Sequence, residues 1–402
     1  MKVLFINNTC KYSSTGKICY ELYKHLNADG HQAYIAYGRG DEINEPGIYK
    51  FGIDSETKIH ALKARITGKN ACYSPRSTKR LLDFIEEVKP DLVHLHELHA
   101  YFVNRGELLD YLKKKEIPVV WTFHCSYMFT GKCGVTFDCE RYKEGCGHCP
   151  YMHRYINSWF FDRTVELLKE KKQELDGLQI KKIVTPSSWL ANKTADTFLG
   201  NRPIGVVNNG IDAKGLFYPR KDVKSLLEAY DIEPEKKIIL SVAEDIMYVQ
   251  KGGQTILDVS KTLPEVQFVL IGAKETKKIS DNVQMIKRTK DQEELARWYT
   301  LADLFLICSR GENFPTTCIE ALCCGTPIVG IDDGGAKETA DEPFGIFVKA
   351  DSVGYDALIE DIKDAIQTQL SRGHSSERIR EYAVNRYDNV AMYKSYLEIY
   401  KS

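Results

Sequence analysis

The sequence predicts an α/β protein with two domains, each built on a doubly wound parallel sheet. The chain has 402 residues, which is long for one hydrophobic core and suits two domains of about 200 residues. Short apolar runs alternate with amphipathic stretches throughout, as in successive βαβ units. The turn-rich segment 206–212 separates two sets of these runs and indicates a hinge.

Each half of the chain contains five expected strands. In the first half they are residues 3–7, 33–37, 92–95, 119–123 and 183–185, and in the second half 238–242, 267–271, 283–286, 304–308 and 328–331. We place the first domain at 1–205, the second at 206–386 and a terminal helix at 387–402. That helix is expected to present one common face, formed by Tyr387, Val390, Tyr393, Leu397 and Tyr400.

Composition narrows the class of protein. Hydrophobic residues make up 43% and charged residues 28%, as in a soluble globular protein. The net charge of -1 argues against a general nucleic-acid binder. No apolar run reaches the ~18 residues of a spanning helix, and Met1 leads directly into a strand, so we expect neither membrane span nor signal peptide. A cytoplasmic location follows, in which the 12 cysteines are thiols or metal ligands.

Two glutamates eight residues apart bracket a loop that leads into a helix. The helix is expected at 316–324, stopped by Gly325 and Pro327. Glu312 is then at the carboxyl end of a strand, where open α/β sheets bind ligands, and Glu320 lies about one turn into the helix. Carboxylates accept strong hydrogen bonds from sugar and ribose hydroxyls. An exposed acidic loop is the alternative explanation.

Other short motifs suit phosphates and sugars. Lys251, Gly252 and Gly253 open a helix, where a cation and free amides favour a diphosphate, although a solvated turn is equally consistent. Ser13 to Gly16 cap a helix with an apolar face at Ile18, Cys19, Leu22 and Leu26.

Histidines and cysteines form two further groups. His124 ends a strand, where it could bond a sugar and partly neutralise charge. His94, His96 and His99 have no evident fourth ligand, which argues against zinc there. The loop 125–150 contains Cys133, Cys139, Cys146 and Cys149, whose last pair has the spacing of a structural zinc site. Free thiols and a disulfide remain alternatives.

The segment from Glu312 to Glu320 resembles the E-x7-E signature of retaining glycosyltransferases of family 4, and the resemblance extends from Asn7 to Glu338. It implies the GT-B architecture, two Rossmann-like domains with a ligand cleft, and a last helix that returns to the first domain. It also implies transfer of a sugar from a nucleotide diphosphate donor, with no catalytic divalent metal. A similar cysteine-containing insertion occurs in the exopolysaccharide branch of the family.

The resemblance assigns roles to individual residues. Glu312 would hold donor sugar hydroxyls, Glu320 the ribose, and Lys251 the leaving diphosphate. His124 matches a Thr-x-His motif beside the donor sugar. The remaining donor-binding positions that we carry over are Gly16, Arg310, Asn313, Phe314, Gly334 and Gly335.

Three positions depart from the family pattern. The stretch 243–247 lacks the arginine that usually accompanies the lysine, and Arg310 is the substitute that the sequence offers. Cys125 stands where relatives have aspartate after the histidine, and we assign it no role. The loop ending at Gly16 has one glycine where two are usual.

Basic and aromatic residues in the first domain suggest a lipid-facing surface. The segment 58–80 contains Lys58, Lys63, Arg65, Lys69, Arg76, Lys79 and Arg80, and the segment 151–161 contains Trp159, Phe160 and Phe161. Such a combination is typical of peripheral contact with an anionic membrane, and an ordinary solvated helix and loop explain it equally well.

The function predicted is retaining transfer of a sugar from a nucleotide diphosphate donor, UDP-sugar before GDP-sugar, to a saccharide or lipid-linked acceptor in cell-surface polysaccharide or capsule synthesis. Two alternatives stay open at this point. One is a nucleotide-sugar epimerase on the same fold, and the other is a zinc-stabilised interaction protein with a degenerate site. Nucleic acid is not expected as a partner.

Overall fold

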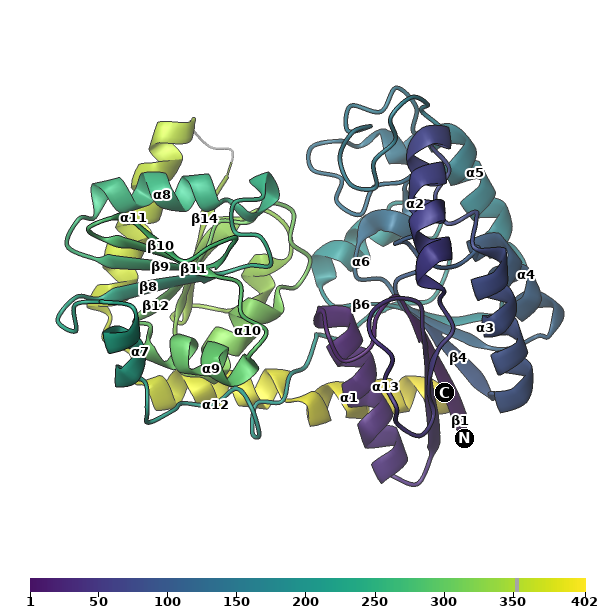
Figure 1. Cartoon of the computed structure of the whole chain (residues 1–402), viewed down its shortest axis with the longest axis horizontal. Coiled ribbons are helices and arrows are strands. Elements are labelled where there is room, and N and C mark those ends of the chain that lie inside the picture. The colour runs from purple at the N-terminus through teal and green to yellow at the C-terminus, as the bar shows by residue number, and fades with distance from the viewer. Residues whose placement is uncertain (351–353) are drawn as a thin grey trace. The chain divides into compact units, whose positions relative to one another are not determined.

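The computed structural model describes residues 1–350 and 354–402, which form two compact units. The first unit comprises Met1–Asn208 together with Met392–Ser402, and the second comprises Asn209–Ala391. Each unit is built around a seven-stranded sheet with helices on both faces (Figure 1). Among the described helices, none is long and apolar enough to cross a membrane.

The sheet of the first unit is parallel, in the order β3-β2-β1-β4-β5-β6-β7. Its strands are β1 (Lys2–Asn7), β2 (Gln32–Tyr37), β3 (Ile48–Lys50), β4 (Leu92–Leu95), β5 (Val119–Thr122), β6 (Ile180–Thr185) and β7 (Ile204–Val206). The helices are α1 (Ser14–Ala28), α2 (Asp54–Thr67), α3 (Pro75–Val88), α4 (Arg105–Lys114), α5 (Thr164–Leu175) and α6 (Ser188–Ala195), with short 3₁₀ turns η1 (Ser126–Phe129) and η2 (Arg141–Lys143).

The second unit has the strand order β10-β11-β9-β8-β12-β13-β14, in which only the described edge strand β10 is antiparallel to its neighbour. Its strands are β8 (Ile238–Val242), β9 (Gln267–Ala273), β10 (Lys277–Ser280), β11 (Val283–Lys287), β12 (Leu304–Ile307), β13 (Ile328–Asp332) and β14 (Gly345–Lys349). The helices are α7 (Lys224–Ala229), α8 (Gly253–Thr262), α9 (Gln292–Leu301), α10 (Thr316–Cys323), α11 (Tyr355–Ser371) and α12 (Ser376–Tyr387), with η3 (Val249–Lys251) and η4 (Ala336–Thr339).

All ten expected strands are present, and the four that were not expected lie at sheet edges. These are β3, β7, β10 and β14, whose residues are mostly half-buried or exposed. An edge strand need not be apolar on both faces, so it lacks the continuous apolar run by which central strands are recognised. β7 also ends at Val206, so the predicted hinge begins inside a strand.

The expectation of one terminal helix with a common face is wrong. Tyr387 ends α12 and packs in the core of the second unit, and a new helix, α13 (Asn389–Lys401), begins after Asp388. The buried side of α13 consists of Met392, Tyr393, Tyr396 and Tyr400, which pack against the first unit's core. The divisions at 205 and 386 stay predictions as limits of independently folding domains.

Hydrogen bonds fix α13 to the first unit. The Tyr400 hydroxyl lies 2.7 Å from Nδ1 of the fully buried His94, and the Tyr396 hydroxyl lies 2.8 Å from Oγ1 of Thr122. The other ring nitrogen of His94 also bonds Thr122, at 2.8 Å. His94 therefore serves the packing of the terminal helix on β4 and β5.

Candidate active site

The candidate donor site of the second unit is formed by loops after three neighbouring strands. β8, β12 and β13 are adjacent and parallel, so their carboxyl ends meet at one edge of the sheet. The loop after β8 carries Lys251, the loop after β12 carries residues 310–314, and the loop after β13 carries residues 333–335. Backbone bonds join them, from Arg310 N to Gln250 O at 2.8 Å and from Gly311 N to Asp333 O at 3.0 Å.

Lys251 and Glu312 form an ion pair at the centre of this edge. Nζ of Lys251 lies 2.5 Å from Oε1 of Glu312, and both side chains are only partly exposed. The amides of the first turn of α8 follow Lys251 directly, and amides at a helix N-terminus favour an anion. The structure thus brings the lysine predicted for the diphosphate and the glutamate predicted for the sugar into direct contact.

Arg310 has an acidic partner that the sequence reasoning missed. Its Nε donates to Oδ2 of Asp333, in the loop after β13. Asp333 directly precedes Gly334 and Gly335. The bond holds the guanidinium of Arg310 near the loop that carries Glu312. A second cation is therefore present at this edge of the sheet, although it is held by a carboxylate.

Two glycines allow the loops to approach closely. Gly334 has a φ of 114° and forms a bridge with Glu312, and a Cβ there would lie 2.2 Å from the Glu312 carbonyl oxygen. Gly252 has a φ of 72°, and its Cβ would lie 2.2 Å from the carbonyl oxygen of Cys308. Gly335 instead donates its amide to Glu312 O at 2.7 Å, so this amide is used within the protein.

The rest of the Glu312–Glu320 segment is mostly buried. Asn313 is half-buried in the loop, and Phe314 packs edge-on to Tyr387 with ring centroids 5.7 Å apart. The helix α10 begins at Thr316 as expected and carries Glu320, which accepts a hydrogen bond of 2.9 Å from the Tyr299 hydroxyl. Burial, followed by the charge of Glu320, raises the pKa of Tyr299 well above its usual value, so this hydroxyl remains a donor.

In the first unit, Gly16 lies in a tight loop at the start of α1. Ser13 caps the helix by accepting from the Gly16 amide, and the predicted apolar face is buried. A Cβ at Gly16 would lie 2.9 Å from Oγ1 of Thr9 and 3.2 Å from its carbonyl oxygen, so a larger residue would push this loop apart. Asn7 ties the loop to β1 by donating to Thr9 O at 2.9 Å.

His124 lies two residues beyond β5 and contacts a second histidine. Its Nε2 is 2.9 Å from Nδ1 of His96, and the rings stack at 5.2 Å. Burial lowers the pKa of His124 to about 4 and holds that of His96 well below its usual value. Two neutral imidazoles can share one hydrogen bond, so His96 sets the tautomer and orientation of His124.

The four predicted zinc ligands line one small cavity of about 20 Å³, together with Thr130, Thr136, Arg141, Tyr142 and Thr164 among others. The hydrogen bond between Cys133 and Cys149 raises the pKa of Cys133 and lowers that of Cys149 to about 6. The four sulfurs do not all lie within the 4.8 Å of one another that would mark a formed metal cluster. The loop thus gathers the four thiols without closing them into a tetrahedral set.

Two buried lysines hold this cysteine loop. Lys171 is fully buried and donates to Thr130 O at 2.8 Å, and Lys132 donates to Ile156 O at 2.8 Å. Burial lowers the pKa of both ammonium groups. These residues give no pattern in the sequence, because an isolated lysine is usually solvated.

Two family models match the chain in succession. Residues 15–214 match the model described as Glycosyltransferase Family 4, and residues 214–386 match Glycosyl transferases group 1. The chain belongs to glycosyltransferase family 4. Its two Rossmann-like units are those of the GT-B fold, as predicted.

Two similar proteins carry names that refer to colanic acid biosynthesis and to a cps region. This family 4 chain is 26% identical over 272 residues to the putative colanic acid biosynthesis glycosyl transferase WcaC of Escherichia coli strain K12, an alignment that covers 66% of the chain and 65% of that protein. It is 22% identical over 347 residues to an uncharacterized 41.2 kDa protein in the cps region of Klebsiella pneumoniae, covering 84% and 86% of the two chains.

Solved structures share the fold along the full length. A sucrose-phosphate synthase from Thermosynechococcus elongatus has a TM-score of 0.73 at 16% identity and covers 100% of this chain and 98% of its own. HepE from Anabaena, in complex with UDP-glucose, has a TM-score of 0.67 at 14% identity and covers 100% and 99%. At these identities the likeness shows the fold alone.

Proposed function

We propose that this glycosyltransferase moves a sugar, with retention of anomeric configuration, from a UDP-sugar to a saccharide or lipid-linked acceptor in cell-surface polysaccharide synthesis. The observation that carries the proposal is the contact of Lys251 with Glu312 at the carboxyl edge of the second sheet. A cation that suits the leaving diphosphate thus lies beside a carboxylate that suits sugar hydroxyls, which supports the proposal. The putative colanic acid biosynthesis role of WcaC supports the pathway class.

In this proposal Lys251, Arg310 and the first amides of α8 stabilise the departing diphosphate, and no divalent metal takes part. The acceptor oxygen attacks the anomeric carbon from the side that the diphosphate leaves, and the diphosphate receives the acceptor proton. Glu312 binds hydroxyls of the transferred sugar.

Glu320 supplies a test that separates nucleotide recognition from sugar recognition. If Glu320 accepts from the ribose, Glu320→Gln should weaken UDP and UDP-sugar by the same factor, about 10- to 150-fold, since a hydrogen bond to a charged group contributes about 1.5–3 kcal/mol. Isothermal calorimetry with both ligands measures this. Tyr299→Phe, which removes a hydroxyl that donates to Glu320, is the structural control and should change both affinities less.

A thermal-shift screen of nucleotides and nucleotide sugars identifies the base first. A ligand at about 100 times its Kd should stabilise the protein by about 2.7 kcal/mol. Stabilisation by UDP and UDP-sugars, and not by GDP or ADP, is the expected result. A nucleotide sugar could instead stabilise the protein and be converted into another nucleotide sugar, with no acceptor present and no hydrolysis. That result would favour an epimerase.

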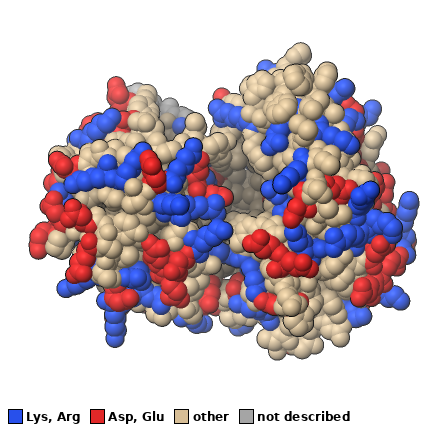
Figure 2. Space-filling view, in the orientation of Figure 1, with Lys and Arg blue, Asp and Glu red and all other residues tan. Residues whose placement is uncertain are grey.

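We also propose that the first unit contacts an anionic membrane through α2 and the neighbouring aromatic segment. The exposed side of α2 carries Ile59, Leu62 and Ile66, at helical spacing, among Lys58, Lys63 and Arg65. Trp159 N donates to Arg65 O at 2.7 Å, so the exposed Trp159, Phe160 and Phe161 continue the same apolar strip. In Figure 2, residues other than charged ones form a wide area beside α2 bordered by Lys and Arg.

The basic residues in the second half of the segment 58–80 contribute less to this surface, because two of them bind groups of the protein itself. Arg80 donates to Tyr49 and Lys50, and Lys79 pairs with Asp83. Leu62→Ser combined with Trp159→Ser should weaken binding to phosphatidylglycerol vesicles about tenfold or more, since burying one large apolar side chain contributes about 1.5–3 kcal/mol. Vesicle sedimentation measures the binding. Ile279→Ser, at an exposed apolar residue of the second unit, is the control and should bind like the wild type. Equal binding by the wild type, the double variant and the control would contradict the membrane proposal.

The four-cysteine loop is proposed to hold one structural Zn²⁺, with Cys133, Cys139, Cys146 and Cys149 as ligands. The cavity that they share supports this proposal. Zinc content of protein purified without added metal should fall by one equivalent in Cys139→Ser, with lower protection from hydrogen exchange across 125–150. Unchanged zinc content, with four titratable thiols in the native protein, would contradict it.

A further inference from the structure

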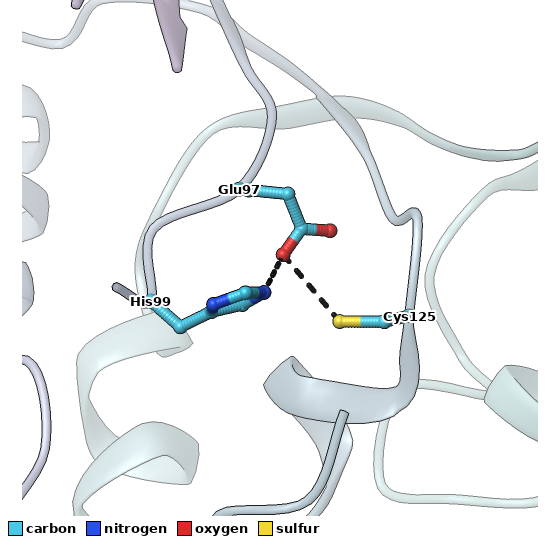
Figure 3. Close-up of side chains that lie close together, drawn as sticks. All are labelled: Glu97, His99 and Cys125. Carbon is cyan, nitrogen blue, oxygen red and sulfur yellow. Dashed lines mark hydrogen bonds and ion pairs between the residues drawn. The ribbon is translucent and has the colours of Figure 1, made fainter. Parts of the chain in front are cut away.

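A different group of metal-binding side chains lies outside the four-cysteine loop. Glu97, His99 and Cys125 each offer one ligand atom, and the three atoms lie within 4.8 Å of one another. Figure 3 shows the Glu97 carboxylate between the His99 ring and the Cys125 sulfur. One oxygen, Oε2, contacts Nε2 of His99 and lies 3.4 Å from Sγ of Cys125.

The fold brings these residues together from two loops. β4 and β5 are adjacent and parallel, and the three residues follow the carboxyl ends of these strands. Glu97 is buried, and His99 is largely covered. Directly after His99, Ala100 and Tyr101 have φ of 79° and 70°, a left-handed conformation that costs a non-glycine residue about 1–2 kcal/mol. The surrounding structure therefore holds this loop in a conformation that the chain alone disfavours.

The outer contacts orient the possible ligands inward. The Tyr155 hydroxyl lies 3.0 Å from Nδ1 of His99, which leaves Nε2 facing Glu97. The backbone amide of Glu97 donates to Oδ1 of Asn7 at 3.3 Å. A histidine that binds a metal usually forms a hydrogen bond through its other ring nitrogen, as His99 does with Tyr155. This bond fixes the tautomer and the orientation of the ring.

We propose that Glu97, His99 and Cys125 bind one Zn²⁺ ion. A thiolate and an imidazole favour zinc over magnesium or calcium, which prefer oxygen ligands. The carboxylate and the thiolate balance the charge of the ion, and the thiol proton is released to solvent as the Zn–S bond forms. Three protein ligands leave the fourth tetrahedral position to water or to a hydroxyl of a bound molecule.

The ion cross-links the loops after β4 and β5. Cys125 directly follows His124, so a fixed Cys125 also fixes the backbone of the histidine that contacts His96. A cysteine nucleophile is a poorer explanation of the cluster. The thiol donates to Glu97, while the His99 ring contacts the carboxylate, so no imidazole is placed to take the thiol proton.

Metal titration of the apoprotein tests the proposal without any enzyme assay. Protein stripped with a chelator is titrated with Zn²⁺ against a competing indicator, and the number of equivalents is compared among variants. The wild type should bind one equivalent more than Cys125→Ser and than Glu97→Gln. Cys72→Ser, which removes another half-buried thiol of the same unit, should match the wild type.

Two further variants keep the test decisive if Cys125→Ser does not fold. Tyr155→Phe keeps all three ligands and should weaken the site about 10- to 100-fold. Cys125→Asp should still bind one Co²⁺ at this site. Its sulfur-to-cobalt charge-transfer absorption should be weaker than that of the wild type, because the Cys125 thiolate no longer binds the ion. Cys139→Ser reports the cysteine loop separately, so loss of an equivalent there and not in Cys125→Ser or Glu97→Gln would overturn the proposal. Equal stoichiometry and affinity in wild type, Cys125→Asp and Tyr155→Phe would also overturn it.

Discussion

Glu312→Gln is expected to lower turnover of the donor about 10- to 150-fold while UDP binds as tightly as before or more tightly. Removing one hydrogen bond from a charged group costs about 1.5–3 kcal/mol, and here the cost falls on the transition state, where the sugar carries more charge. UDP itself lacks the sugar. Its affinity should not fall, because Lys251 loses the partner that competes with the diphosphate.

Lys251→Met, in contrast, should lower the affinity for both UDP and UDP-sugar, because it removes the cation proposed to bind the diphosphate. The double variant measures the coupling of the two residues. Asp332→Asn breaks the Lys337–Asp332 pair of the same unit and should change turnover by at most about fivefold, since an exposed pair contributes about 0–1 kcal/mol. Full turnover in folded Glu312→Gln, or equal loss of UDP affinity in both single variants, would contradict these roles.

Gly252→Ala is expected to destabilise the second unit and to weaken donor binding. Its Cβ would lie 2.2 Å from the Cys308 carbonyl oxygen, a backbone contact that cannot rotate away, and φ is 72°. Overpacking costs about 1–3 kcal/mol and the left-handed conformation about 1–2 kcal/mol. Relief of the clash would move the Lys251 turn away from β12, so Kd for UDP should rise as well.

Gly30→Ala is the matched control, because Gly30 has a φ of 78° but open space around its Cβ position. It should lose only the conformational part, about 1–2 kcal/mol, with UDP affinity unchanged. Urea unfolding gives the totals, and hydrogen exchange assigns the loss to α8 or to α1. Equal losses in the two variants would show that the close approach to Cys308 does not constrain the site.

The sequence was sufficient for the central strands and for the order of the site's loops. Buried parallel strands such as β12 are continuous apolar runs, and the residues that follow them must lie at one edge of the sheet. The resemblance to family 4 assigned Lys251, Glu312 and Gly334 to one donor site, and in the structure Glu312 contacts both Lys251 and Gly334.

Contacts between residues distant in sequence could not be predicted. Asp333 for Arg310, Tyr299 for Glu320 and His96 for His124 are partners set by side-chain packing, which leaves no spacing pattern. Cys125 had no role because its partner Glu97 is 28 residues away in sequence. The break between α12 and α13 was missed because the tyrosines on either side of Asp388 continue a helical spacing.

The proposed reaction is transfer of sugar from a nucleotide diphosphate donor with retention of configuration. Proton NMR of the sugar released when the purified protein slowly hydrolyses its UDP-sugar tests this without knowledge of the acceptor. The first product should have the donor's anomeric configuration and should form about 10- to 150-fold more slowly with Glu312→Gln, which excludes a contaminating hydrolase. An inverted anomer at the earliest time points would contradict the account.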